Sequence, residues 1–289
     1  MHSISNNYLS IQIDSKGAEL QSLYHKRHNL EYMWSGDPAI WGKKSPVLFP
    51  IVGELKDKTY IYNGKNYNLS RHGFAREMEF EVTEQTDTSI TFSIHSNEQT
   101  LSIYPFVFAF SVRYTLIENA LQITYTIENR SNETLYFSVG GHPAFKIPLV
   151  DGTTYEDYHL VLNEEETAGR WPISPEGLIE TTPTPLLKNE SILPLRKELF
   201  SADALVFKDL KSTSVALKSA KTEHGLNVTF KDFPYLGIWE TKGGDFVCIE
   251  PWCGIADSVN ASGNLEEKEG INTLEPSGKF EVAYSIEVF

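Results

Sequence analysis

A two-residue hydrophobic period runs through most of this chain and restricts what it can fold into. In Phe106–Ile117, "FVFAFSVRYTLI", an extended backbone has one mainly apolar face and one more polar face. This pattern is typical of half-buried antiparallel strands. It recurs in Tyr8–Asp14, Met78–Glu84, Ser89–Ser96, Leu121–Asn129, Tyr158–Asn163, Leu226–Phe233, Asp245–Glu250 and Lys279–Phe289. The sequence therefore predicts an all-β fold built from antiparallel strands.

Two hairpins are predicted from turn chemistry. Tyr60–Leu69, "YIYNGKNYNL", carries Asn63-Gly64 between aromatic-rich arms, and both residues tolerate the positive φ that a tight hairpin turn requires. Leu116–Ile123, "LIENALQI", predicts a second hairpin with its turn near residues 118–120.

Length and composition favour one domain over residues 1–289. All-β folds of this size are often single units, and the 40% of hydrophobic residues can supply a large core. The Pro- and Thr-rich segment Ala168–Leu195 could be a linker, but it retains apolar residues throughout. We therefore interpret it as a long excursion within one large two-sheet β-sandwich. Helical periodicity never exceeds a turn or two, so only short helices are expected, at Asp37–Lys43 and Leu195–Phe200.

Charge and composition exclude several classes of partner. The net charge of −14 disfavours binding to nucleic acid or to anionic lipid. We find neither a signal peptide nor an apolar run near the ~20 residues of a membrane span. Cys248 and Cys253 fit a reducing compartment, so a cytoplasmic protein with free thiols is predicted, and the Cys-x4-Cys spacing is only a weak metal signal.

Two of the eight histidines stand in unusual surroundings. His72 precedes Gly73 in "SRHGFAREMEF", and His142 lies between Gly141 and Pro143 in "GGHPAF". Glycine and proline at a strand end fix a tight backbone path that can project a side chain into a cleft. An imidazole in such a cleft can exchange a proton near neutral pH. The other histidines are expected to be surface or satisfied core groups: His2, His25, His28, His95, His159 and His224.

One carboxyl group, that of Glu250, has neighbours that favour acid–base chemistry. Glu250 ends the apolar strand "DFVCIE" and shares a face with Phe246 and Cys248 if the strand alternates regularly. Desolvation by such neighbours would raise its pKa and its strength as a base. The alternative is a solvated acid at the end of a strand.

Several segments jointly resemble the aldose 1-epimerase family, also called galactose mutarotase-like proteins, and within it the LacX-like branch of bacterial proteins. "HGFAR", "GGHPAF" and "VCIEPW" are similar to the family's two histidine motifs and to its glutamate strand. The final "LEPSGKFEVAYSIEVF" resembles the family's closing strand, and "GAELQSL" matches near the start. The order and spacing agree over almost the whole chain.

The resemblance implies a fold, a reaction and roles for three residues. Members fold as a large antiparallel β-supersandwich with an open cleft, and they interconvert the α and β anomers of an aldose without a metal or organic cofactor. By this resemblance His142 is the general acid at the ring oxygen, Glu250 is the base at the anomeric hydroxyl, and His72 binds and polarises the ring oxygen. The chain would then be an isomerase whose partner is a small-molecule sugar. A positioned acid–base pair typically accelerates such proton transfers roughly 10²–10⁴-fold.

Substrate-binding residues are also suggested. Asp203 resembles the family's substrate-binding aspartate, with Asp209 and Asp245 as competitors and a surface acid as the alternative. Arg71 could contact a hydroxyl or an anion, or form a salt bridge.

Aromatic side chains could stack on a pyranose face, although core packing is the commoner role of each. The candidates are Trp239, Trp252 and Phe145.

One segment departs from the family pattern. In Pro46–Asp57, "PVLFPIVGELKD", relatives often have arginine after the glycine, whereas Glu54 follows Gly53 here. This argues against a phosphorylated hexose. Basic residues that could still supply a cation are Lys43, Lys44, Lys56, Arg71 and Arg76.

Other readings remain open. A non-catalytic carbohydrate-binding protein could use the same scaffold, and a mutarotase could act on a hexose 6-phosphate. A glycoside hydrolase or lyase would need two carboxylates about 5–9.5 Å apart. In this sequence the neighbouring residues mark only one such carboxylate, that of Glu250. His72, His142 and Glu250 could also ligate zinc by residue type. The sequence leaves the choice between monomer and homodimer open.

Overall fold

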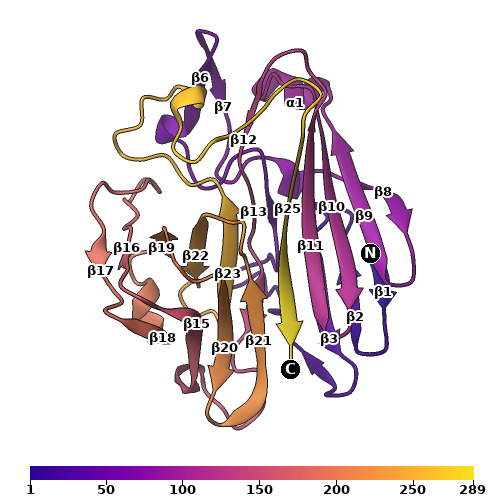
Figure 1. Cartoon of the computed structure of the whole chain (residues 1–289), viewed down its shortest axis with the longest axis vertical. Coiled ribbons are helices and arrows are strands. Elements are labelled where there is room, and N and C mark those ends of the chain that lie inside the picture. The colour runs from indigo at the N-terminus through magenta and orange to yellow at the C-terminus, as the bar shows by residue number, and fades with distance from the viewer.

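The computed structural model describes residues 1–289, and its largest element is a nine-stranded antiparallel sheet (Figure 1). The long central strands follow the predicted two-residue period, since buried and less buried residues alternate along β11 and β25. In spatial order the strands are β18 (Glu190–Pro194), β15 (Tyr158–Glu166), β20 (Ser214–Ser219), β21 (Thr222–Thr229), β25 (Lys279–Val288), β11 (Ala120–Asn129), β10 (Phe108–Ile117), β9 (Ser89–His95) and β8 (Glu81–Gln85).

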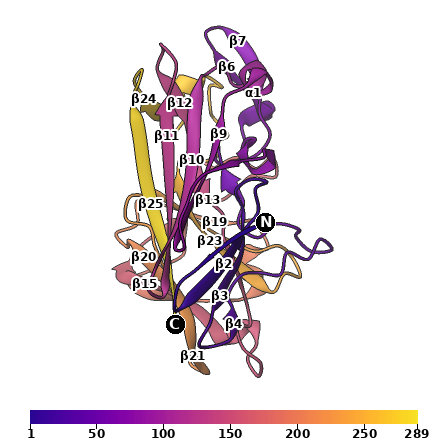
Figure 2. The same cartoon turned by 90° about the vertical axis from the view of Figure 1, so that its right-hand side faces the viewer.

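A six-stranded antiparallel sheet carries Glu250 and Trp239, and His142 lies between two of its strands. Its order is β19 (Leu205–Lys208), β22 (Tyr235–Trp239), β23 (Phe246–Cys253), β13 (Val139–Gly141) and β5 (Val47–Leu48), and β14 (Ala144–Lys146) also pairs with β23. The view in Figure 2 sets the long strands β25, β11 and β10 in one layer, with β13 and β23 beside them. The predicted β-sandwich class is confirmed.

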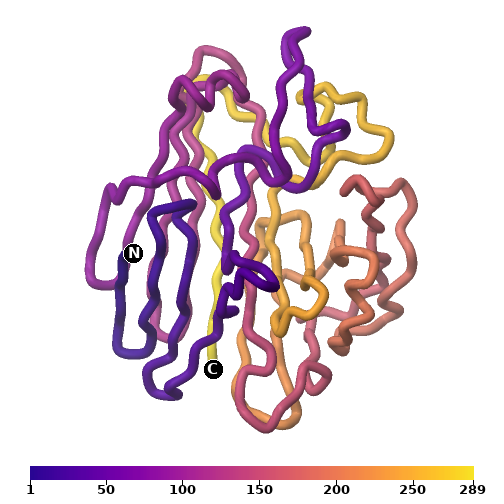
Figure 3. Tube along the Cα trace, turned by 180° about the vertical axis from the view of Figure 1, so that it is seen from behind, coloured from indigo at the N-terminus to yellow at the C-terminus, as the bar shows by residue number.

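Smaller sheets complete the molecule. A four-stranded sheet contains β1 (His2–Ser5), β2 (Leu9–Ile13), β3 (Leu20–His25) and β4 (Leu30–Glu31). The two-stranded pairs are β6 (Thr59–Tyr62) with β7 (Lys65–Asn68), β12 (Leu135–Phe137) with β24 (Asn272–Leu274), and β16 (Gly169–Arg170) with β17 (Thr184–Pro185). Figure 3 shows the N-terminal strands and the excursion through β16 to β18 on opposite sides of the molecule.

Both predicted hairpins are confirmed. β6 and β7 flank Asn63 and Gly64, whose φ angles are 48° and 71°. β10 and β11 meet at Glu118, with φ 52°. Asn63 and Gly64 have the positive φ that the sequence predicted for their turn.

Helices are short, as expected, but not all lie where the sequence placed them. A 3₁₀ turn, η4 (Lys197–Phe200), lies within the predicted segment Leu195–Phe200. The predicted helix at Asp37–Lys43 is wrong, because only a turn forms there, in which the backbone N–H groups of Ile40 and Trp41 bond to the Asp37 carbonyl.

The one α-helix, α1 (Glu98–Ile103), was not predicted. It begins with a capping box between Asn97 and Thr100, a local signal that hydrophobic periodicity does not detect. The remaining 3₁₀ turns are η1 (Lys56–Lys58), η2 (Ala75–Glu77), η3 (Tyr155–Asp157) and η5 (Leu265–Glu267). No helix has the length and apolar character needed to cross a membrane.

One hydrophobic cluster of 65 buried residues runs from Ile4 to Val288. Both ends of the chain therefore contribute to the same core, as a single domain over residues 1–289 would require. The single-domain assignment stays a prediction. Two small clusters lie beside this core around Trp252 and Phe246, on the six-stranded sheet.

Candidate active site

Strand register places His142 beside Glu250. β13 pairs with the end of β23, where Gly140 lies opposite Trp252. β14 pairs with the start of β23, where Ala144 lies opposite Cys248. The residues between these two short strands therefore fall opposite the middle of β23, where Glu250 lies. "GGHPAF" is thus the crossing between two strands that share one neighbour.

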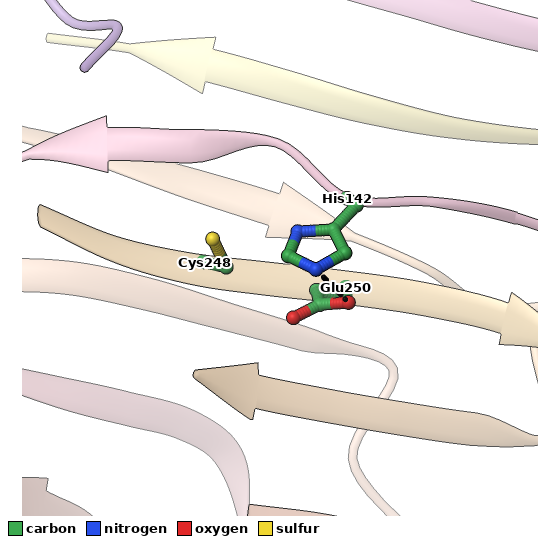
Figure 4. Close-up of side chains that lie close together, drawn as sticks. All are labelled: His142, Cys248 and Glu250. Atoms are coloured by element: carbon green, nitrogen blue, oxygen red, sulfur yellow. Dashed lines mark ion pairs between the residues drawn. The ribbon is translucent and has the colours of Figure 1, made fainter. Parts of the chain in front are cut away.

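His142 and Glu250 contact each other directly. The distance from His142 Nε2 to Glu250 Oε2 is 3.2 Å, and their side chains are 9% and 2% exposed. Figure 4 shows this pair with Cys248, which precedes Glu250 by two residues and therefore lies on the same face of β23. The predicted alternation is observed, since Val247 and Ile249 join the main core while Phe246 and Cys248 join a separate cluster.

A left-handed turn brings His72 to the same place. His72 has φ 68° and Gly73 has φ 72°, and the His72 N–H donates to the Gly53 carbonyl at 2.8 Å. A Cβ at Gly73 would lie 2.3 Å from the Phe49 carbonyl oxygen, so only glycine fits there. The His72 and His142 ring centroids are 5.7 Å apart with the rings nearly perpendicular.

The tautomer of neutral His72 follows from its hydrogen bond. The Gly53 N–H donates to His72 Nδ1 at 3.1 Å, so that nitrogen accepts and the ring proton is on Nε2. Burial holds the pKa of His72 well below its usual value, and nearby His142 and Arg71 lower it further. His72 is therefore a neutral hydrogen-bond donor at physiological pH.

Burial shifts the other two groups in opposite directions. It lowers the pKa of His142 to about 3, with smaller contributions from Arg76 and Arg71. It raises the pKa of Glu250 well above its usual value, and Asp203 adds to this while Arg71 opposes it. The ion pair and the neutral pair each carry one proton, and burial favours the neutral pair. One mobile proton between an acid and a base is what reversible proton transfer needs.

Tryptophans form the walls around His142. The ring centroids of Trp41 and Trp239 lie 5.1 Å and 5.5 Å from that of His142. The indole N–H of buried Trp252 has no hydrogen-bond partner. Phe145, by contrast, is fully buried in the main core, so its suggested role in stacking on a sugar is wrong. The alternation of β14 turns it inward, away from the site.

Asp203 and Arg71 meet at the rim. Their Oδ2 and Nη2 atoms are 3.6 Å apart, and both side chains are partly exposed. Asp203 lies just before β19, an edge strand of the six-stranded sheet. Its competitors lie elsewhere, since neither Asp209 nor Asp245 lines this site and Asp245 contacts Lys197 instead.

The candidate site is one cavity of about 390 Å³, and Trp41, Trp239 and Trp252 are among the residues that line it. It contains every predicted site residue, namely His142, Glu250, His72, Arg71, Asp203 and Trp239. Sequence reasoning missed Trp41, as well as Ile173, Gly177 and Ile179 from the long excursion. No short motif marks these residues, and only tertiary packing brings them here.

By donor type, His142, Cys248 and Glu250 could hold a metal ion. One ligand atom from each lies within 4.8 Å of the others. Thiolate, imidazole and carboxylate are ligands that zinc accepts. This set differs from the one considered from the sequence, because Cys248 replaces His72. That the protein works without a metal or other cofactor stays a prediction.

Comparison with known proteins identifies the family. The model of the family described as aldose 1-epimerase matches residues 1–286. The chain belongs to the aldose 1-epimerase family.

Relatives of this aldose 1-epimerase family member cover nearly its whole length. The chromosomal protein LacX of Lactococcus lactis subsp. lactis is 37% identical over 99% of this chain and 98% of its own. A solved galactose mutarotase related enzyme from Lactobacillus acidophilus is 40% identical, with a TM-score of 0.95 over 100% of this chain and 97% of its own. A galactose mutarotase-like protein from Lactobacillus casei is 30% identical, with a TM-score of 0.93 over all of both chains. The resemblance to the LacX-like branch is confirmed.

Proposed function

We propose that this protein is a cytoplasmic mutarotase that interconverts the α and β anomers of an aldohexose. Family membership supports an isomerase-type enzyme that acts on a sugar. The observation that carries the finer proposal is the buried contact of 3.2 Å between His142 and Glu250 in the cavity wall. In a cyclic aldose the ring oxygen and the anomeric hydroxyl are both bonded to C1. One acid and one base a few Å apart can therefore reach both oxygens of a single sugar.

Ring opening moves two protons. The ion-pair form of His142 and Glu250, which carries the same single proton as the favoured neutral form, is the one that reacts. In that form the Glu250 carboxylate takes the proton of the anomeric hydroxyl, while the His142 imidazolium donates one to the ring oxygen. The bond between C1 and the ring oxygen breaks, and its electron pair stays on that oxygen as C1 becomes an aldehyde carbon. Rotation about C1–C2 and closure from the other face, with the reverse transfers, yields the other anomer. The pair thereby returns to its initial protonation state, and no co-reactant is consumed.

His72 assists as a neutral donor in this proposal. Its Nε2–H is free to bond to the ring oxygen because Nδ1 is occupied by the Gly53 N–H. A neutral donor polarises the C1–O bond without competing with His142 for the proton. Arg71 and Asp203 would hold hydroxyl groups at the far end of the ring, and Trp239 would cover an apolar face.

Saturation-transfer NMR tests the proposal directly. Freshly dissolved galactose or glucose should show faster exchange between its anomeric signals when the protein is added. Loss of this acceleration in Glu250→Gln, with sugar binding retained, supports catalysis by the named base. If no aldose or aldose phosphate exchanges faster than in buffer, a carbohydrate-binding protein becomes the better account.

A second candidate is the same reaction on a negatively charged aldose such as a hexose 6-phosphate. Arg76 favours it, because this residue lines the cavity and its Nε has no hydrogen-bond partner. The other basic candidates have partners. Lys43 contacts Glu77, and Arg71 contacts Asp203. The Lys44 ammonium donates to the Gln21 carbonyl, and that of Lys56 donates to the Ala261 carbonyl. Comparing exchange of glucose with that of glucose 6-phosphate separates the two candidates.

A further inference from the structure

Three groups that can ligate a metal ion meet at the middle of β23, and the proposed reaction uses only two of them. His142, Cys248 and Glu250 each offer one ligand atom, and these atoms lie within 4.8 Å of one another (Figure 4). All three residues are more than nine-tenths buried. The Cys248 thiol has no part in the proposed ring opening. It nevertheless lies close to both groups that do.

Buried polar atoms in this group lack the partners that such atoms normally have. Glu250 Oε2 and His142 Nδ1 are both buried without a hydrogen-bond partner. Glu250 Oε2 lies only 3.2 Å from His142 Nε2, yet no aligned hydrogen bond joins the two atoms. Most buried polar atoms in proteins are satisfied, and an exception points to a catalytic role or to a bound ion. The carboxylate can therefore accept a cation on the side that faces the imidazole.

The spacing of the atoms suits a shared cation. Two ligand atoms that each lie ~2.1 Å from one zinc ion, at a tetrahedral angle, are about 3.4 Å apart. The distance of 3.2 Å between His142 Nε2 and Glu250 Oε2 is close to this value. The Cys248 ligand atom lies within 4.8 Å of the other two, so a shift of at most about 1.2 Å gives the ~3.6 Å that a zinc-bound thiolate requires. His142 and Glu250 line the catalytic cavity, so an ion between them meets the space in which the sugar reacts.

Charge favours a divalent cation with an affinity for sulfur. A Zn²⁺ ion bound by one thiolate, one carboxylate and one neutral imidazole forms a complex without net charge. A buried site tolerates such a complex, whereas it penalises an uncompensated charge. The surroundings of Cys248 are apolar and include Trp34 and Phe246. The nearby cation Arg71 is itself paired with Asp203. Mg²⁺ and Ca²⁺ prefer sites made of oxygen ligands, and this group offers a single carboxylate.

We propose that His142, Cys248 and Glu250 form an inhibitory site for Zn²⁺ at the inner wall of the catalytic cavity. The ion replaces the protons of the thiol and of the carboxyl group, which pass to solvent, and it occupies lone pairs of His142 and Glu250. Neither residue can then exchange a proton with a sugar. Binding of the ion is independent of the proposed function, whereas the inhibition rests on it.

Cadmium binding tests the site without any sugar. Cd²⁺ accepts the same ligands as Zn²⁺, and its bond to a thiolate gives an ultraviolet charge-transfer band. We expect this band in the wild type and its loss in Cys248→Ser, which replaces the thiol by a hydroxyl of similar size. Cys248→Ala repeats the test with a second side chain.

Cys253→Ser is the matched control. Cys253 is also buried in β23, but it joins the main core, and its thiol donates to the Asp232 carbonyl at 3.6 Å. Its odd spacing from Cys248 places it on the opposite face of the strand. The Cys253→Ser variant should therefore keep the cadmium band.

Zn²⁺ should also slow anomer exchange by the wild-type protein. At ten times the dissociation constant about one eleventh of the sites remain free, so the rate should fall about tenfold. Cys248→Ser should need at least about tenfold more Zn²⁺ for the same inhibition, relative to its own rate without metal, because only two of the three good zinc ligands remain. Cys253→Ser should respond as the wild type does, and Mg²⁺ should leave the rate of each protein unchanged.

Several results would overturn the proposal. The site is refuted if the wild type shows no cadmium band, if the band survives in both Cys248 variants, or if it is lost in Cys253→Ser. Faster anomer exchange with Zn²⁺, or equal inhibition of the wild type and Cys248→Ser, would refute the inhibitory role. If no sugar exchanges even without metal, the mutarotase proposal fails, while the cadmium band still decides whether the metal site exists.

Discussion

At the scale of single residues, the site depends on a carboxyl group that is costly to bury. Glu250 is 1% exposed, and its raised pKa means that the folded protein retains a proton that the unfolded chain releases. Above the unfolded value near 4.5 the folded state therefore holds more protons. Its stability falls as pH rises from that value through the folded pKa. The group with the best claim to a catalytic role thus reduces stability at neutral pH.

Glu250→Gln should separate these two effects. We expect anomer exchange to fall roughly 10²–10⁴-fold, since an amide cannot take the hydroxyl proton. The variant should also melt at a higher temperature than the wild type at pH 8, with a smaller gain at pH 5, because glutamine has no proton to lose. Thermal unfolding at the two pH values checks this. If the gain in melting temperature is the same at both pH values, the burial of Glu250 does not make stability depend on pH.

His72→Asn tests the donor without straining the turn. Asparagine tolerates the positive φ that His72 adopts, whereas most residues do not. We expect a lower kcat and a higher KM for anomer exchange, with a melting temperature close to that of the wild type. His72→Ala is the comparison, because it should lose stability as well as activity. Wild-type kinetics in His72→Asn would remove His72 from the mechanism.

The number of protons that His142 and Glu250 hold together predicts how the rate of anomer exchange depends on pH. Since the pKa of His142 is lowered to about 3, the pair does not gain a second proton until the pH is well below 5. Since burial raises the pKa of Glu250 well above its usual value, the single proton is lost only as pH rises through that raised pKa. We expect kcat/KM, corrected for the buffer reaction, to show no fall as pH is lowered through the ordinary histidine range and to decline as pH rises through the raised pKa of Glu250. A fall centred near pH 6.5 would show instead that an ordinary, solvated histidine controls the rate.

At the scale of elements, β13 couples the site to the core of the molecule. A Cβ on Gly141 would lie 2.6 Å from the hydroxyl of Tyr284 in β25 and 2.9 Å from that of Tyr125 in β11. The six-stranded sheet is therefore tightly packed against two tyrosines of the nine-stranded sheet one residue before His142. A side chain there must displace either these tyrosine rings or β13, and a shift of β13 moves His142 away from its place beside Glu250.

Gly141→Ala should accordingly affect both stability and catalysis. Overpacking of this kind costs about 1–3 kcal/mol, and the displaced imidazole should lower kcat. Gly152→Ala is the matched control, because its Cβ would meet nothing within 4 Å. That variant should lose stability through its positive φ alone and keep wild-type kinetics. Denaturant unfolding and NMR exchange measure the two effects. Unchanged kcat in Gly141→Ala would show that β13 does not position His142.

At the scale of the whole molecule, three histidines join two sheets. His25 ends β3, His28 lies in the following turn, and His224 lies in β21 of the nine-stranded sheet. The His25 and His28 rings are stacked with centroids 3.9 Å apart, and those of His28 and His224 are 4.7 Å apart. Burial lowers the pKa of His25 and of His28. Positive charge on His28, His224 and Arg27 lowers the pKa of His25 further.

The contact between these three histidines should weaken in acid. A histidine with a lowered folded pKa takes up its proton more readily when unfolded, so stability declines as pH falls below about 6.5. Protonation of His25 would also break the bond that its Nδ1 accepts from the His28 N–H. We expect the melting temperature to drop less between pH 7 and pH 5 in His28→Gln than in the wild type. An identical drop would mean that this histidine cluster does not make the stability of the protein depend on pH.

Much of this architecture follows from local pattern, and the exceptions share a cause. Alternation in Leu121–Asn129 and turn chemistry at Asn63-Gly64 predicted strands and a hairpin because both are properties of a few consecutive residues. The turn at Asp37 and the short helix α1 were misjudged because one hydrogen bond more or less decides such short elements. Phe145 was given a role in the site because the sequence does not show which face of β14 points inward.

The candidate site also combines features that the local sequence marks with features that depend on tertiary structure. The neighbours of His72, His142 and Glu250 mark them locally, since glycine, proline and apolar strand residues next to a titratable group are visible in sequence. That the three come together depends on β13 and β14 pairing with the same strand, and on a turn attached to Gly53. These contacts join residues far apart in the chain, and no local preference encodes their register. The amino-acid sequence by itself thus determined the strands, the turns and the reactive groups. Only tertiary structure decided that those groups share one cavity and that Trp41 and the long excursion help to enclose it, because these properties arise from packing between distant segments.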